Sequence, residues 1–351
     1  MTSEQHPDRE LPPLVDVMIA VAVAVLVIAL LAAGGAPRSV PAGLTGASTA
    51  VSWALPLLRL IADAAAIACS GCLLAAVWLL QATDGQRLGG RAVRACRDAA
   101  VAAGIWSVAT AGGLVSTAAV VLGIPLTQLP ERATDAAGVP QIRALAATVL
   151  VTAVLAIVLS GCRSVVTARI AAFLTAVAVI APLLTGHAAA EQSTVLATVA
   201  TASLAVHVLA ASAWIGGLGA LVRYARVHDP ITAVTHYSVH DPIAAVTRYS
   251  RLALVAAAST GFSGLVTAEI HLAHRGGWDL VTGWFAGGYG VLALAKVFAF
   301  VVLVAIGGWH RHTTLPLLGA GDNRPFWRLA IVELILMAAT VGIAVALSRT
   351  P

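Results

Sequence analysis

The sequence predicts an all-α membrane protein, a bundle of about nine transmembrane helices. Two observations support this fold class. Hydrophobic residues make up 59% of the 351 residues and charged residues only 11%, with a mean hydropathy of +0.91. A soluble protein of this length needs more charged surface. Apolar runs of about 20 residues also recur along the chain, and each is long enough to cross about 30 Å of hydrocarbon.

The predicted spans follow one another with short polar connections. They lie at residues 15–34, 55–81, 99–122, 142–160, 166–185, 193–221, 251–272, 287–309 and 326–347. The first 14 residues form a polar leader with an acidic excess, unlike the basic start of a cleaved signal. We therefore expect the first span to be a retained anchor helix.

The basic residues predict the orientation of the bundle. With the N-terminus in the cytoplasm, 14 arginines fall on the inner side of the membrane, in the leader, the inner loops and the inner ends of spans, and only 5 on the outer side. Positive residues gather on the cytoplasmic side of membrane proteins. We therefore expect a cytoplasmic N-terminus and an extracytoplasmic C-terminus. This placement of the arginines also accounts for the net charge of +5 without a nucleic-acid partner.

One predicted inner loop, residues 227–250, is a tandem repeat. "VHDPITAVTHYS" at 227–238 is followed by "VHDPIAAVTRYS" at 239–250, and ten of twelve positions match. A doubled ligand site is one interpretation, because the loop carries histidines beside aspartates. Replication slippage in a tolerant loop is the other, and we favour it because added loop length costs little free energy.

Several ionisable residues fall inside the predicted spans, where a charge costs a few kcal/mol and marks a functional candidate. Asp63, Lys296 and Glu333 are the principal ones. Asp63 and Lys296 have similar predicted depth and opposite charge, so we expect them to form an ion pair. Such a pair could serve packing or function, and the sequence does not separate these roles.

Two pairs of side chains have the spacing of metal ligands. Cys69 and Cys72 form a C-x-x-C within the second span, and thiolates suit Cu(I). The alternative is that both are small buried apolar residues. His271 and His274 are also three apart, near the predicted outer surface, where they could bind a divalent metal or Cu(II). A solvated loop edge is the more ordinary account of these histidines.

His207 is the most informative residue of the sixth predicted span. Its helical stripe includes Trp214, and a second stripe carries small residues: Ser212, Gly216 and Ala220. Small residues four apart allow two membrane helices to approach closely. The histidine could be structural, bonded to a backbone carbonyl. Its depth in the membrane favours a functional role.

Five segments together resemble the copper resistance D (CopD) family. They are "AVHVLAASAWIGGLGALV", "VTRYSRLALVAAASTGFSGLVTA", "GGYGVLALAKVFAF", "WHRHTTLP" and "FWRLAIVELILMAATVGIAVAL". The resemblance places His207 in the signature helix, Lys296 at the family lysine and Glu333 in the last helix. Tyr249 stands where the family usually has phenylalanine. The second copy of the repeat continues into a family helix, so the first copy is the inserted one.

The resemblance implies a domain organisation. The chain would consist of the leader 1–14, a five-helix region at 15–185 and a CopD-like four-helix domain at 190–348. It also implies a bacterial inner-membrane protein that moves copper between periplasm and cytoplasm and is not an enzyme. The sequence contains no nucleotide-binding motif that would indicate nucleotide hydrolysis. A periplasmic copper chaperone is an expected partner.

We therefore expect His207 to be a copper ligand or gate, with Cys69 and Cys72 as the other ligands of a Cu(I) ion and Trp214 beside it. Lys296 would balance the thiolate charge or pair with Asp63. Two alternatives remain open. One is a haem- or electron-handling protein with His207 as an axial ligand. The other is a copper tolerance or assembly factor that transports nothing.

Overall fold

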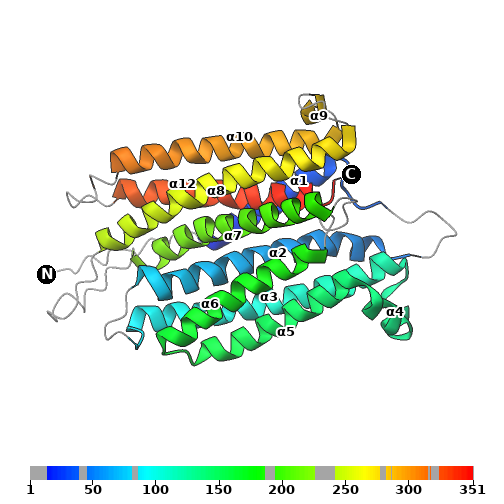
Figure 1. Ribbon diagram of the computed structural model, residues 1–351, viewed down its shortest axis with the longest axis horizontal. Coiled ribbons are helices and arrows are strands. Elements are labelled where there is room, and N and C mark those ends of the chain that lie inside the picture. The colour runs from blue at the N-terminus through cyan, green and yellow to red at the C-terminus, as the bar shows by residue number, and fades with distance from the viewer. Residues whose placement is uncertain are drawn as a thin grey trace, which may run out of the picture.

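The chain folds into a bundle of long helices, drawn in Figure 1. The computed structural model describes residues 14–38, 46–80, 86–185, 194–225, 242–276, 282–285, 287–314, 317 and 324–350. All the regular elements of these segments are helical, apart from one isolated bridge between Arg87 and Ser164. The predicted all-α fold class is confirmed.

Nine helices within the described segments are long and apolar enough to cross a membrane, as the sequence predicts. They are α1 (Leu14–Ala32), α2 (Thr49–Leu74) with the π-helical turn Ala75–Leu79, α3 (Gly90–Leu122), α5 (Pro140–Ser160), α6 (Val165–Ile180) with the 3-10 turn Ala181–Thr185, α7 (Thr194–Ala225), α8 (Pro242–Gly276), α10 (Gly287–Trp309) with the π-helical turn His310–Thr314, and α12 (Arg324–Leu347). The short helices α4 (Ala133–Gly138) and α9 (Thr282–Phe285) lie in connections.

Two predicted boundaries are wrong by nine residues. Helix α3 begins at Gly90 rather than 99, and α8 begins at Pro242 rather than 251. Both extra segments carry arginines, which the prediction treated as loop residues. Arginine can extend its charged head to the membrane surface while its helix continues, so charge alone does not end a helix. Proline at the first turn suits the start of α8.

The correction changes the interpretation of the repeated segment. Residues 242–250, most of the second copy, are the first turns of α8 rather than a loop. Residues 227–241 lie outside the described segments. Arg248 from this turn donates hydrogen bonds from Nη1 to the carbonyl oxygens of Trp78 and Leu79, at 3.3 and 3.2 Å. These carbonyls lie at the end of the π-helical turn Ala75–Leu79, where helix carbonyls need hydrogen-bond donors from outside the helix.

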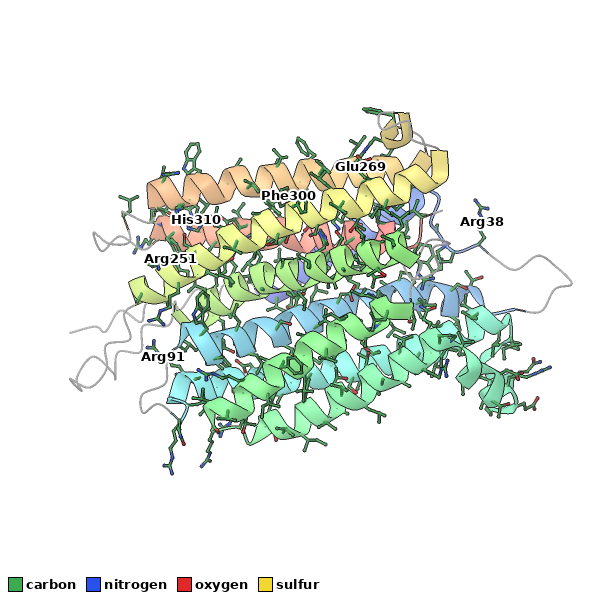
Figure 2. All side chains as sticks on the ribbon, in the orientation of Figure 1. Arg38, Arg91, Arg251, Glu269, Phe300 and His310 are labelled. Carbon is green, nitrogen blue, oxygen red and sulfur yellow. The ribbon has the colours of Figure 1, made fainter. Side chains whose placement is uncertain are left out.

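Residues that the sequence assigned to opposite sides of the membrane lie at opposite ends of the bundle. Figure 2 labels Arg91, Arg251 and His310 at one end and Arg38 and Glu269 at the other. Arg91, Arg251 and His310 lie in or next to predicted inner loops, and Arg38 lies in the predicted outer loop after the first span. This agrees with the alternating direction of successive spans. That the arginine-rich end faces the cytoplasm stays a prediction.

Helices that are distant in sequence lie together in space. Figure 1 shows α1 beside α12, and α12 also packs with α10, whereas α2, α3, α5 and α6 form a separate group. Leu26 and Leu30 of α1 are fully buried in a cluster with Val345 and Ala346 of α12. The first helix of the predicted 15–185 region therefore packs against the carboxy-terminal helices. The predicted domain boundary at about 190 stays a prediction.

Helix α7 joins the two groups through a backbone contact with α2. A Cβ added to Gly71 would lie 2.1 Å from the carbonyl oxygen of Gly216, and one added to Gly216 would lie 2.3 Å from that of Ile67. Only hydrogen fits between the helices here. Ser212 and Ala220, one turn before and after Gly216, are both buried. The predicted ridge of small residues is the surface by which α7 packs.

This contact predicts that a single added methyl group at Gly216 destabilises the protein. Gly216→Ala should lower stability by about 1 to 3 kcal/mol, because overpacking at a rigid backbone forces the helices apart. The measurement is the thermal unfolding midpoint of the full chain in detergent. Gly113→Ala in α3 is the matched control, since a Cβ there meets nothing within 4 Å. Equal midpoints for the two variants would show that α7 and α2 are not in backbone contact.

Candidate functional site

His207 lies near the middle of α7 and faces α8. Its Nδ1 is 2.9 Å from the carbonyl oxygen of Thr260. Gly264, one turn further along α8, leaves room for the ring, since a Cβ there would lie 3.0 Å from Cε1 of His207. One turn earlier on α7, the Ser203 hydroxyl donates to the carbonyl oxygen of Ser263 at 2.9 Å. The polar stripe of α7 is therefore anchored on the backbone of α8.

Lys296 reaches the other nitrogen of the same ring. Its Nζ lies 3.3 Å from Nε2 of His207. A carbonyl oxygen can only accept a hydrogen bond, so Nδ1 of the ring must carry the proton that Thr260 receives. In the neutral ring Nε2 is then an acceptor, and the lysine amine is its donor. The ring is held at both nitrogens, and its only lone pair is occupied by Lys296.

This arrangement corrects the predicted ion pair between Asp63 and Lys296. Asp63 instead pairs with Arg59, one turn earlier on α2, at 3.0 Å. Both of these side chains are more than a third exposed within the chain. An arginine four residues away on the same helix reaches the carboxylate without any constraint on tertiary packing. Lys296, on α10, faces the interior of the bundle instead.

Trp214 lies two turns beyond His207 and is buried. Its indole meets the ring of Phe300 edge-on, with centroids 6.0 Å apart. Phe300 is one turn beyond Lys296 on α10, so the aromatic pair lies beside the histidine and lysine pair on the same two helices. The main-chain oxygen of Trp214 accepts a hydrogen bond from the Tyr249 hydroxyl at 2.9 Å. Two helices thus fix the segment of α7 that follows His207.

Cys69 and Cys72 are buried, but the structure does not bring them to His207. Cys69 lies 3.9 Å from the Thr175 hydroxyl, and Cys72 lies 3.4 Å from the Tyr224 hydroxyl. Tyr224 follows His207 by 17 residues on α7, which is about 26 Å along a helix axis. The structure therefore does not group the imidazole and the two thiols, and copper binding by these residues stays a prediction.

The thiol of Cys72 belongs instead to a polar network that sequence patterns did not indicate. The Tyr224 hydroxyl donates to Asp98 of α3 at 2.5 Å, and Arg223 pairs with the same carboxylate oxygen at 2.7 Å. These contacts join α2, α3 and α7 at the end of the bundle that carries most arginines. Their partners are more than 100 positions apart in the chain, which no local spacing can reveal.

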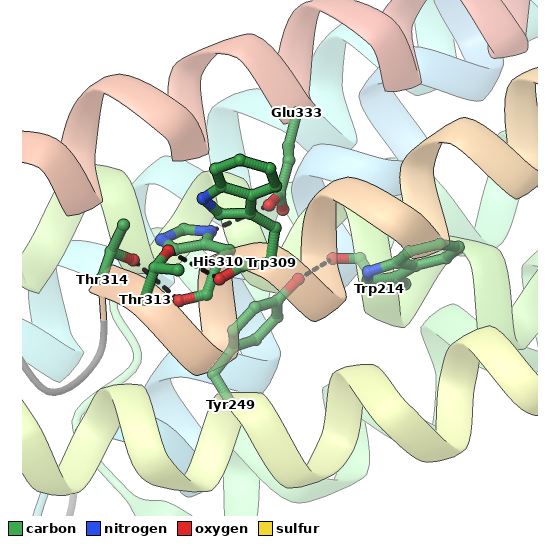
Figure 3. A network of polar contacts seen from close by, with 7 residues as sticks. All are labelled: Trp214, Tyr249, Trp309, His310, Thr313, Thr314 and Glu333. Atoms are coloured by element: carbon green, nitrogen blue, oxygen red, sulfur yellow. Dashed lines mark hydrogen bonds and ion pairs between the residues drawn. The ribbon is translucent and has the colours of Figure 1, made fainter.

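Glu333 has a partner that the sequence analysis did not single out. Its Oε1 lies 2.8 Å from Nδ1 of His310, and both side chains are more than nine-tenths buried. Figure 3 shows the pair between α12 and the π-helical turn that follows α10. The signal that could have found His310 was Glu333 itself, because a buried carboxylate needs a donor from a neighbouring span.

The remaining predicted ligands cannot be placed. The side chains of His271 and His274, in the last turns of α8, lie outside the described residues. Within the part of the chain that is described, no group of three or more histidine, cysteine, aspartate or glutamate side chains is arranged to hold a metal ion. His207 with Lys296 and His310 with Glu333 are the two described pairs that include a histidine.

Comparison with known families identifies the carboxy-terminal part of the chain. Residues 243–347 match the model of the family described as copper resistance protein D. The match begins within the second copy of the repeat, as expected if that copy leads into a family helix. It contains Lys296, His310 and Glu333, whereas His207 lies before it. Comparisons with curated proteins and with solved structures give no match.

Proposed function

Because the chain belongs to the copper resistance protein D family through residues 243–347, we propose that it binds copper at His207 and moves the ion across the inner membrane of a bacterium. Family membership supports a copper-resistance role in a multi-pass membrane protein. The observation that carries the finer proposal is the contact of His207 with Thr260 and Lys296. Copper is the cargo, and a periplasmic copper chaperone is its proposed soluble partner.

The state of the His207 ring suits a copper ligand. Histidines that bind metals usually donate their second ring nitrogen to a carbonyl or carboxylate, which fixes the tautomer and aims the other nitrogen at the metal. The Thr260 carbonyl has this role here, and imidazole nitrogen is a good ligand for copper. The other nitrogen, Nε2, faces Lys296 and is the atom that copper would bind.

Lys296 makes the proposed site a gated one. Copper can reach the Nε2 lone pair only after the lysine amine has moved away, since one lone pair serves one partner. A protonated lysine would also repel the cation. In the proposed cycle, arrival of copper displaces Lys296, and return of the lysine releases the ion. This exchange would keep copper from resting permanently at the middle of the membrane.

Replacing His207 by leucine tests the ligand. His207→Leu removes both ring nitrogens and leaves an apolar span, so the protein should still insert. We expect bound copper to fall by about one ion per chain and copper flux into proteoliposomes to fall at least tenfold, an estimate based on the loss of about 1.4 kcal/mol or more of binding. Ser203→Ala is the matched control, because Ser203 makes the same kind of contact with α8 but offers no ring nitrogen.

Two outcomes would overturn this assignment. Full copper content and flux in His207→Leu would make the histidine structural. A Soret absorbance band in the purified chain that disappears in His207→Leu would instead identify a haem ligand.

Replacing Lys296 by leucine tests the gate. Lys296→Leu removes the competing donor and its charge without adding a ligand. We expect copper to bind roughly tenfold more tightly or better, since a hydrogen bond to a charged group contributes about 1.5 to 3 kcal/mol. Competition with a chromophoric Cu(I) chelator measures this affinity. Lys296→Arg keeps a cationic donor and should not tighten binding. Weaker binding in Lys296→Leu would show that the lysine supports the site and does not compete for it.

A further inference from the structure

We propose that His310 provides a second copper-binding nitrogen, held ready by Glu333 near the arginine-rich end of the bundle. This inference rests on the proposed function for its cargo, but it concerns a different site and different helices. His310 follows Lys296 by 14 residues along α10 and its π-helical turn, or about 21 Å. The two sites are therefore separate stations rather than parts of one coordination sphere.

The first support is the hydrogen bond to Glu333. An ionised carboxylate only accepts, so the ring donates from Nδ1 to Oε1 across 2.8 Å. The lone pair of the neutral ring is then on Nε2. A carboxylate behind a histidine is the arrangement found behind metal-bound imidazoles, where it sets the tautomer and raises the basicity of the ligating nitrogen.

The second support is the state of Nε2 itself. This atom is buried and has no hydrogen-bond partner among the described residues. A buried polar atom without a partner is uncommon, and a bound ion is one explanation of it. Protonation would not remove the difficulty, because it would replace a bare lone pair by an N–H donor that also lacks an acceptor. A bound metal ion would satisfy the lone pair.

The surroundings hold the ring in place. Phe326 of α12 packs against it with ring centroids 4.4 Å apart. The turn that begins at His310 is π-helical, and the Thr314 hydroxyl donates to the His310 carbonyl oxygen at 2.8 Å (Figure 3). Widened π-helical turns often occur at functional sites. The imidazole is therefore fixed by a carboxylate, an aromatic ring and its own backbone.

The number of ligands indicates the strength of the site. Among the described residues, the pair supplies one free ligand, Nε2 of His310, because Glu333 lies on the Nδ1 side of the ring, and no group of three or more ligands is arranged there. Imidazole suits copper, but a site with so few protein ligands holds it weakly. Weak binding suits a station from which an ion must leave, as conduction requires. We therefore expect two binding steps, one for each histidine.

The test is an anaerobic Cu(I) titration of the full-length chain in detergent, against a chromophoric chelator. The wild-type protein should show two steps. His310→Leu should keep the step that His207→Leu removes and lose the other one. Glu333→Gln should weaken the same step by about 10- to 100-fold, because the amide oxygen still accepts from Nδ1 but carries no charge. His312→Leu is the matched control, since this histidine lies in the same turn but is exposed.

The outcomes separate this inference from the proposed function. If His310→Leu keeps both steps while His207→Leu loses one, the site at His310 is overturned and the site at His207 stands. If His310→Leu changes only the pH dependence of copper flux, the pair binds a proton and the metal assignment is wrong. Loss of both steps in His310→Leu with an unchanged unfolding midpoint would also contradict two separate stations.

Discussion

The close packing of α7 against α2 at Gly216 and Gly71 is the constraint on which the rest of the molecule depends. The two backbones approach so closely that neither glycine can carry a side chain. This contact places α7 between the group formed by α2, α3, α5 and α6 and the helices that the copper resistance family model matches. The opposite face of α7 is thereby directed at α8, where His207 and Ser203 bond to backbone carbonyl oxygens.

The position of His207 gives the lysine of α10 its partner. A lysine in the interior of a membrane bundle is costly unless a nearby acceptor receives its hydrogen bond. The neutral His207 ring is such an acceptor, because its one N–H, on Nδ1, donates to the Thr260 carbonyl oxygen and leaves the lone pair on Nε2. The family-matched region contains Lys296 but not His207, so the proposed site is assembled from both parts of the chain. Copper can then compete with Lys296 for a single lone pair.

Sequence patterns predicted much of this fold because the membrane restricts it. Nine apolar runs could only be nine spans, and a ridge of small residues around Gly216 could only be a surface for close packing. The predicted starts of α3 and α8 were wrong because helices continue past the hydrocarbon through arginine-bearing turns. The partners of Lys296 and Cys72 could not be predicted for another reason. Depth along a helix says nothing about which face a side chain occupies or which helix lies opposite.

Two residues show what only the assembled structure can reveal. The sequence resemblance led us to expect phenylalanine at Tyr249, and the hydroxyl of Tyr249 donates to the main chain of Trp214, which supplies a hydrogen bond between α8 and α7. His310 lies in a histidine-containing segment that resembled a closing loop. It becomes a candidate ligand only because α12 places Glu333 against Nδ1 and leaves Nε2 without a partner in the described structure.

The central claim is that copper replaces Lys296 at Nε2 of His207. The most direct measurement is the ¹⁵N NMR spectrum of the histidine rings during Cu(I) titration, with His207 assigned through the His207→Leu variant. We expect a large shift of the His207 Nε2 resonance as the first ion binds, while Nδ1 keeps its proton and its hydrogen bond to Thr260. An unchanged Nε2 resonance in protein that has bound copper would contradict the account.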